Sequence, residues 1–423
     1  PAANQGSAVK IAIVGSGISG LTSAYLLNRS HEISLFEASD RVGGHTHTVD
    51  VTVDGQSYAV DTGFMAFNDW AYPNFIRLLG QLGVAFKPTP MSFSVTDPDT
   101  GLWYNSNNLN SLFSQRRNLL SPGFWGMLRD ISRFNKVAQR DLIEGQIAAD
   151  TTLDDYLKAG GYGERFILHY IVPMGAAIWS MSMADILGFP MRTFVRFFNN
   201  HGLLSADNRR PWCVIEGGSN AYIGPLTASF KQKIRLNDPV NRVERDGDGV
   251  VIHSAAGSER FDKVVFACHS DQALQMLARP SDAEQSILGA LPYADNEVVL
   301  HTDTRVLPEQ KLAWAGCNYR LGGPGHTRAA VTYDMNIVQG IESDTTFCVS
   351  LNQSAGISPF KVLAQYTYAH PQFSLAAVAA QERWEELNGA HHTYFCGAYW
   401  ASGSHEDGVI SALRVARALG ETL

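Results

Sequence analysis

The 423-residue chain has few cysteines, no long apolar run and no cluster of basic residues. Its five cysteines are widely spaced and form no Cys-x-x-Cys pair, which indicates buried free thiols in a reducing compartment. Apolar stretches such as residues 171–179 are too short to cross a bilayer. The formal net charge of −8 argues against a nucleic-acid partner. These absences favour a cytoplasmic globular protein that is large enough for two domains.

The N-terminal region contains a dinucleotide-binding pattern. A short apolar strand leads into three glycines at Gly15, Gly17 and Gly20, and a helix follows. Gly15 permits the tight turn, Gly17 lets the backbone approach a pyrophosphate, and Gly20 lets the helix pack on the strand. The helix offers free N–H groups to the phosphates. A second strand ends at Glu37, whose carboxylate can accept hydrogen bonds from ribose hydroxyls.

An arginine and a pair of glycines follow Glu37 almost at once, at Arg41, Gly43 and Gly44. A simple NAD dehydrogenase has no need for them. The run resembles the R-x-G-G signature of the flavin-containing amine oxidase and carotenoid (phytoene) desaturase superfamily. The resemblance implies that FAD is the cofactor, that Arg41 lies by its phosphates, and that Gly43 and Gly44 let the backbone pass close to the flavin.

Three further segments are similar to cofactor-binding parts of this superfamily. A hairpin predicted about Asp54-Gly55 leads to a D-x-G segment that the superfamily places beside the cofactor. A strand over residues 234–240 is similar to one whose valine touches adenine, although an ordinary buried valine would also explain it. Near the C-terminus a strand is predicted to end at Gly397 and a helix to begin near Asp407, where free N–H groups would suit a polarised flavin carbonyl. The residues implied by these segments are Asp61, Gly63, Val240, Gly397, Asp407, Gly408 and Val409.

No metal site is predicted. His45 and His47 are separated by one residue, and His391 and His392 are adjacent. Neither pair has a cysteine or acidic partner at ligand spacing. We interpret both pairs as structural or as neighbours of the flavin.

The predicted fold class is α/β, with a Rossmann-like FAD-binding domain of the glutathione-reductase type. This domain is interleaved with a substrate domain of mixed sheet and helices, and a helical insertion is expected from about residue 105 to 204. The FAD-binding domain is predicted over 1–85, 205–270 and 385–423, and the substrate domain over 86–204 and 271–384. Strands are predicted over 234–240, 243–245, 250–253 and 261–266, and in a second sheet over 296–301, 327–334 and 347–352.

Three runs, 173–180, 197–204 and 332–336, resemble a bacterial subgroup of NAD/FAD-binding oxidoreductases related to flavoproteins that desaturate fatty-acyl chains. The strand beginning at Asn296 lacks the lysine that flavin amine oxidases commonly carry near the flavin. We therefore predict hydride abstraction from a CH–CH group of a hydrophobic acyl-lipid substrate, with O₂ or another acceptor reoxidising the flavin. A flavin amine or amino acid oxidase and a non-catalytic flavoprotein sensor are the alternatives.

The candidates for catalysis and for substrate contact are polar and aromatic side chains. An aromatic wall for the substrate and ordinary core packing explain the aromatic candidates equally well. The catalytic candidates are His201, Tyr333 and Asp334, and the substrate-binding candidates are Trp179, Tyr399 and Trp400.

A peripheral membrane contact is a further expectation. Residues 189–204 mix phenylalanines with Arg192 and Arg196, which could meet anionic headgroups. A packing helix is the alternative interpretation of this stretch.

Overall fold

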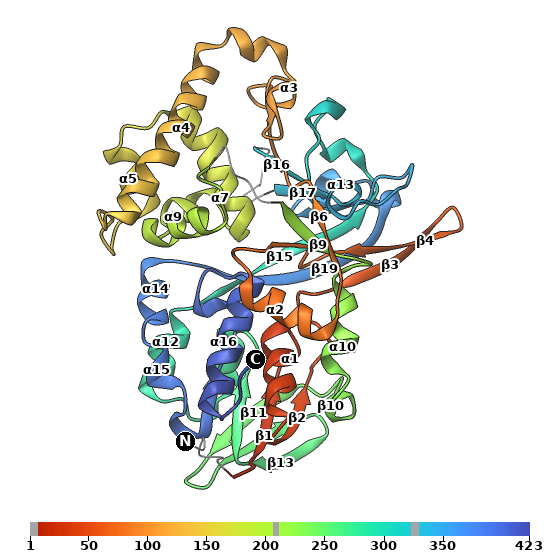
Figure 1. The fold of residues 1–423 in the computed structure, drawn as a ribbon, viewed down its shortest axis with the longest axis vertical. Helices are drawn as coiled ribbons and strands as arrows, with labels where there is room; N and C mark the ends of the chain where they lie inside the picture. The colour runs from red at the N-terminus through yellow and green to blue at the C-terminus, as the bar shows by residue number, and fades with distance from the viewer. Residues whose placement is uncertain (1–6, 206–210, 323–329) are drawn as a thin grey trace.

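The computed structural model describes residues 7–205, 211–322 and 330–423. Its lower part in Figure 1 is built on a five-stranded sheet in which every described neighbour pair is parallel. The strands come from three distant parts of the sequence, as expected for an interleaved Rossmann-like domain. Their order is β10 (Ile234–Arg235), β2 (Glu32–Phe36), β1 (Lys10–Val14), β14 (Lys263–Phe266) and β20 (Thr393–Phe395).

Both faces of this sheet are covered, so the strand β1 is buried on both sides. Ile11 and Ile13 pack with one cluster of helices, and Ala12 and Val14 pack with the elements of the opposite face. The first face carries α1 (Ile18–Leu27), α16 (His405–Ala418), α2 (Pro73–Leu82) and α10 (Ile223–Thr227). The second carries the antiparallel sheet β11 (Val240–Arg245), β12 (Val250–Ser254) and β13 (Gly257–Phe261), with α11 (Ser270–Met276), α12 (Asp282–Gly289), α14 (Leu375–Gln381) and α15 (Trp384–Leu387).

A second large sheet lies above the first in Figure 1. It has seven strands, and its described pairs are antiparallel except for the parallel pair β16–β7. Their order is β19 (Val362–Pro371), β15 (Tyr293–His301), β18 (Cys348–Leu351), β17 (Ala330–Asp334), β16 (Cys317–Arg320), β7 (Phe93–Asp97) and β8 (Leu102–Asn105). Smaller sheets are the hairpin β3 (Thr48–Val53) with β4 (Gln56–Asp61), and β5 (Ala66–Asn68), β9 (Trp212–Ile215) and β6 (Phe86–Thr89).

The helical insertion forms the top of the molecule in Figure 1. Its core is rich in buried aromatic side chains, including Phe134, Phe166 and Trp179. The helices are α3 (Leu109–Leu112), α4 (Pro122–Ile143), α5 (Leu153–Ala159), α6 (Glu164–Phe166), α7 (Val172–Trp179), α8 (Met183–Leu187) and α9 (Met191–Asn200). The short helix α13 (Met335–Gln339) follows β17.

The predicted α/β fold class is confirmed, and so is the hairpin about Asp54-Gly55, whose two residues have φ of 50° and 80°. Two predicted strands are wrong as single elements. Residues 234–240 are divided into β10 and β11 by a turn in which Asn237 has φ of 53°, and residues 261–266 are divided between two sheets at Asp262. Of the predicted strand 327–334, residues 327–329 lie outside the described residues.

The strands of the parallel sheet fall inside the three ranges predicted for the FAD-binding domain. The exact domain bounds stay a prediction. All five cysteines are free thiols, as expected, and four of them are buried.

Candidate functional site

A cavity of about 1180 Å³ extends from the carboxyl ends of the parallel strands to the helical insertion. Ligands of open parallel sheets bind at this edge. One end of the cavity is formed largely by backbone at glycines, the middle by histidines, and the far end by apolar side chains of the insertion.

The predicted glycine turn forms the first end. Gly15 has φ of 110°, and a Cβ there would lie 2.6 Å from the carbonyl oxygen of Ala267. A Cβ on Gly20 would lie 1.9 Å from the Gly15 carbonyl oxygen, so Gly20 does not line the cavity and instead lets α1 approach the turn. Gly17 does line the cavity, and a Cβ there would meet nothing within 4 Å. Since Gly17 gives α1 no side-chain cap, the helix N-terminus offers its N–H groups to an anion.

The loop after β2 packs against this turn. Arg41 Nη1 donates to the Thr46 carbonyl oxygen at 3.1 Å, and Nη2 donates to that of Gly44 at 2.7 Å. A Cβ on Gly44 would lie 2.9 Å from the Cα of Gly17, and Gly43 has φ of 130°. Arg41, Gly43, Gly44 and Glu37 all line the cavity. Gly15, Gly17, Gly43 and Gly44 are together called the glycine cradle below.

Asp61 lies behind the cavity wall. Its carboxylate accepts hydrogen bonds from Thr48 Oγ1 at 2.6 Å and from the backbone N–H of Ser219 at 2.9 Å. Asp61 therefore ties the hairpin β3–β4 to the chain that follows β9 and does not reach the cavity. Gly63 and Val240 do line it, and a Cβ on Gly63 would lie 1.9 Å from the His45 carbonyl oxygen.

The C-terminal wall is placed two residues earlier than the sequence analysis expected. Ser404 caps α16 in a capping box with Asp407, so the helix begins at His405. Asp407 Oδ2 accepts from the backbone N–H groups of Ser402 and Ser404, both at 3.0 Å. Gly397, Gly403, Ser404 and His405 line the cavity, whereas Asp407, Gly408 and Val409 do not. Gly408 faces α1, and Val409 is fully buried.

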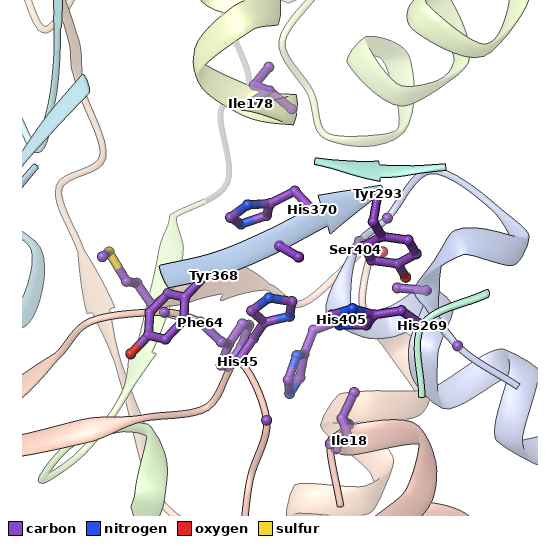
Figure 2. Close-up of a pocket in the computed structure, with 18 of the residues that line it drawn as sticks. Ile18, His45, Phe64, Ile178, His269, Tyr293, Tyr368, His370, Ser404 and His405 are labelled. Carbon is purple, nitrogen blue, oxygen red and sulfur yellow. The ribbon is translucent and has the colours of Figure 1, made fainter. Parts of the chain in front are cut away.

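Four histidines meet in the middle of the cavity, and of these the sequence analysis named only His45, as structural or as a neighbour of the flavin. Figure 2 shows the rings of His45, His370 and His405 directed toward the same space. The ring centroid of His45 lies 5.2 Å from that of His370 and 6.0 Å from that of His269. His269 stacks on Tyr293 at 4.1 Å. These four residues, His45, His269, His370 and His405, are called the histidine cluster.

The histidine cluster is neutral at pH 7. Removal from water lowers the pKa of His45 and of His269 to about 4, and each ring is further disfavoured as a cation by a neighbouring histidine. The same removal from water lowers the pKa of His370 and of His405 to about 3. The cluster therefore gives the cavity polar but uncharged atoms.

His370 is held by a row of two amides, of which Asn296 is buried and Asn352 is half-buried. Asn296 Nδ2 lies 2.8 Å from His370 Nδ1, and Asn352 Nδ2 donates to Asn296 Oδ1 at 2.8 Å. In this arrangement the Nδ1 of neutral His370 accepts, so its proton is on Nε2. Asn296 lies on β15, the strand in which the lysine of amine oxidases is missing.

Apolar side chains of three insertion helices form the far end of the cavity. Leu128 and Ile131 come from α4, Met174 and Ile178 from α7, and Phe197 from α9. Across the described residues, the charged side chains that line the whole cavity are Glu37 and Arg41, and both lie at the glycine end.

Of the predicted catalytic residues, Tyr333 alone lines the cavity in the described part of the chain. Its hydroxyl contacts the Cys317 thiol, and burial raises its pKa. Asp334 instead caps α13, because its Oδ1 accepts from the Ile337 N–H at 3.2 Å. His201 lies behind the wall, stacked on Phe197 at 3.8 Å, and burial lowers its pKa. A role for Tyr333 stays a prediction, and the positions of the other two do not favour contact with a substrate.

The predicted aromatic wall is core packing. Trp179 donates from Nε1 to the Ser402 carbonyl oxygen at 3.0 Å and packs on Phe189 at 4.3 Å. Tyr399 and Trp400 are buried against each other. These three residues are buried and do not line the cavity.

Candidate metal sites and candidate membrane spans are both absent from the described residues. Among them, no group of three or more His, Cys, Asp or Glu side chains is arranged to hold a metal ion. Within the same residues, none of the helices has both the length and the hydropathy of a membrane span.

Comparison with known proteins gives one family match, to the flavin containing amine oxidoreductases, over residues 18–335. L-amino-acid oxidase from Demansia vestigiata is 22% identical over 283 residues, which represent 63% of this chain and 52% of that protein. Among the curated relatives, the match spans between 13% and 56% of their own length.

Solved structures share the fold over nearly the whole chain. Cyclohexylamine oxidase from Brevibacterium oxydans IH-35A is 17% identical with a TM-score of 0.66, and the CLA-producing fatty acid isomerase from P. acnes is 15% identical with a TM-score of 0.68. Each alignment covers 97% of this chain and 98% of the solved chain.

Proposed function

Because the chain belongs to the flavin containing amine oxidoreductase family, we propose that it is an FAD-dependent oxidoreductase that oxidises a CH–CH group of a hydrophobic, acyl-lipid substrate. The observation that carries the proposal is the single cavity with a backbone-lined end and an uncharged apolar end. Bound FAD supplies the hydride acceptor for this chemistry, and the protein supplies binding, orientation and electrostatics.

The glycine cradle fits the dinucleotide. Gly17 leaves open space beside the uncapped N-terminus of α1, where the pyrophosphate would lie. Glu37 would accept from ribose hydroxyls, and Val240 lies on the wall where the adenine is expected. Gly44 and the chain from Gly403 to His405 would face the flavin.

The histidine cluster would orient the cofactor and the substrate without adding charge. His370 holds its proton on Nε2, because Asn296 occupies Nδ1. His405 stacks on Phe64 at 3.8 Å, which fixes the plane of its ring. At pH 7 these neutral rings would act as hydrogen-bonding groups.

The uncharged far end supports the acyl substrate over an amino acid. A substrate carboxylate next to the reacting carbon would need an arginine or lysine beside it, and the described lining has only Arg41, at the other end. Leu128, Ile131 and Met174 instead offer an apolar surface to a hydrocarbon chain. The fatty acid isomerase and the cyclohexylamine oxidase share this fold equally well, so the likeness itself does not choose between the substrates.

An amine oxidase is the second candidate, favoured by the family match and by the neutral aromatic and imidazole groups around the cavity. A non-catalytic flavoprotein is the third. The three are separated by anaerobic mixing of the FAD-loaded protein with a panel of acyl phospholipids and fatty acids and a panel of amines, while the oxidised flavin band is recorded. We expect bleaching by members of the acyl panel, and return of the band when O₂ is admitted.

Two neighbouring residues of α4 provide matched variants. Ile131 lines the apolar end, and Ser132 is exposed. Ile131→Glu should slow bleaching by at least about tenfold, because a buried carboxylate opposes an apolar chain, whereas Ser132→Glu should leave the rate unchanged. Bleaching by amines alone would replace our proposal with the amine oxidase, and bleaching by neither panel would favour the non-catalytic flavoprotein.

A further inference from the structure

In the stretch expected to meet a membrane, residues 189–204, three of the four phenylalanines are buried and Arg196 is exposed. Phe194 and Phe198 of α9 are almost completely buried and stack on each other at 4.4 Å. Arg192 donates from Nε to the Ile147 carbonyl oxygen at 3.1 Å and so is held against the chain. The helix α9 therefore offers no aromatic face to a bilayer.

A different part of the insertion exposes large apolar side chains. Leu109 on α3 is 76% exposed, Leu119 and Leu120 are 47% and 88% exposed, and Trp125 at the start of α4 is 50% exposed. These four residues, with Arg116 and Arg117 between them, are called the α3–α4 face.

Contacts make these residues one continuous surface. Trp125 Nε1 donates to the Leu119 carbonyl oxygen at 2.9 Å, and the Trp125 ring lies 5.3 Å from that of Phe113. Arg116 Nη1 donates to the carbonyl oxygens of Phe113 at 2.7 Å and of Asn110, next to Leu109, at 3.2 Å. The leucines, the tryptophan and the arginines are therefore neighbours across α3, the 3₁₀ helix Arg116–Leu120 and α4.

The chain segment that carries this face has the opposite charge sign to the whole chain. Residues 100–129 contain Arg116, Arg117 and Arg129 and no aspartate or glutamate, although the chain has a net charge of −8. Both Arg116 and Arg117 are exposed, and within the described residues they donate hydrogen bonds to backbone and amide oxygens. In the part of the chain that the structure describes, no carboxylate forms an ion pair with either guanidinium. Exposed leucines and a tryptophan beside arginines are the combination that binds an anionic bilayer surface.

The inner side of the same elements forms the apolar end of the cavity. Leu112 of α3 and Leu128 and Ile131 of α4 line it. The α3–α4 face is therefore the outer surface of the wall that encloses the proposed substrate.

We propose that the α3–α4 face binds the surface of an anionic lipid bilayer, with Leu109, Leu120 and Trp125 in the interfacial layer and Arg116 and Arg117 at the headgroups. The docking itself rests on this face alone. Its meaning, that the acyl substrate reaches the cavity from the bilayer through this wall, rests on the proposed function.

Co-sedimentation of the full FAD-loaded chain with vesicles tests the docking. We expect binding to vesicles of phosphatidylglycerol and phosphatidylcholine, weaker binding to phosphatidylcholine alone, and weakening by salt. Leu120→Glu/Trp125→Glu should reduce binding by about tenfold or more. Phe360, which is 99% exposed on another element, provides the control, and Phe360→Glu should bind as the wild type does. Unchanged flavin content and thermal midpoint show that each variant is folded.

Three results would overturn the docking. The first is that the wild type does not bind vesicles, and the second is that Leu120→Glu/Trp125→Glu binds them equally well. The third is that the wild type self-associates, does not bind vesicles and becomes monomeric in the double variant, which would assign the face to a second copy of the chain. The flavin-bleaching assay with a fatty acid dissolved as monomers separates this inference from the proposed function. A double variant that loses vesicles but still bleaches supports both, whereas vesicle binding without bleaching by any acyl chain keeps the docking and removes the function.

Discussion

The two ends of the cavity are built in different ways. The glycine end is formed by the backbone of residues that are close in sequence. Gly15, Gly17 and Gly44 are glycines because each must leave room for another part of the chain or for a ligand. The apolar end is formed by side chains from α4, α7 and α9, which come together only in the folded insertion. The backbone shape of the glycine end suits one kind of ligand. At the apolar end, substitution of side chains can alter which ligand binds.

The largest effect is expected at the glycine end. Gly17→Ala should lower FAD affinity by about tenfold or more, a loss of at least about 1.4 kcal/mol, because its methyl group would project into the space beside the α1 N-terminus. Folding should be retained, since nothing in the protein lies within 4 Å of that Cβ. Flavin content after gel filtration and titration with FAD provide the measurement.

Gly80 provides the matched control, because a Cβ there also meets nothing within 4 Å and the residue lies on α2, away from the cavity lining. Gly80→Ala should bind FAD normally and gain up to about 1 kcal/mol of helix stability. Normal FAD binding by Gly17→Ala would break the comparison, because the backbone end would then tolerate a side chain.

A medium effect is expected between the two ends, where Asn296 links His370 to Asn352. Asn296→Leu should lower the free energy of unfolding by about 1–3 kcal/mol, because it removes a buried amide that bonds His370 and Asn352, two half-buried side chains. Gln365→Leu, at an exposed position on the neighbouring strand β19, should change it little. Urea unfolding measures both variants. Equal free energies of unfolding for the two would show that the hydrogen bonds of Asn296 do not stabilise the fold.

The smallest effect concerns pH. The folded-state pKa of His269, about 4, lies below its unfolded value of about 6.5, so below pH 6.5 the unfolded chain binds more protons. Stability is therefore present above pH 6.5 and is lost as the pH falls toward 4. His269→Phe, which keeps a ring against Tyr293, should reduce the loss between pH 7 and 5 by on the order of 1 kcal/mol. Parallel pH profiles of wild type and variant unfolding would contradict a neutral His269 in the folded chain.

The glycine end was largely predictable, because Gly15, Gly17 and the Arg41 loop carry their constraints in local spacing. The start of α16 could also have been predicted, since Ser404 and Asp407 have the spacing of a capping box. The helix was instead predicted to begin near Asp407. The histidine cluster needed the fold, because His370 reaches the cavity from β19, a strand that the sequence analysis did not predict.

Aromatic residues gave the weakest guidance. Phe194 and Phe198 suggest a membrane face in the sequence and are core residues in the structure, whereas the exposed Leu120 and Trp125 carry no pattern of their own. Local sequence shows that a ring is present, and only packing decides whether a helix turns that ring inward or outward.

The central claim is that one cavity holds FAD at its glycine end and a hydrocarbon chain at its apolar end. Anaerobic titration of the FAD-loaded protein with a fatty acid, recorded through the visible spectrum of the bound flavin, tests it most directly. The account predicts a saturable spectral change in the wild type and in Ser132→Glu, and its loss in Ile131→Glu, with flavin content equal in all three. A saturable change that survives in Ile131→Glu, or a change produced by amines and by no fatty acid, would contradict the account.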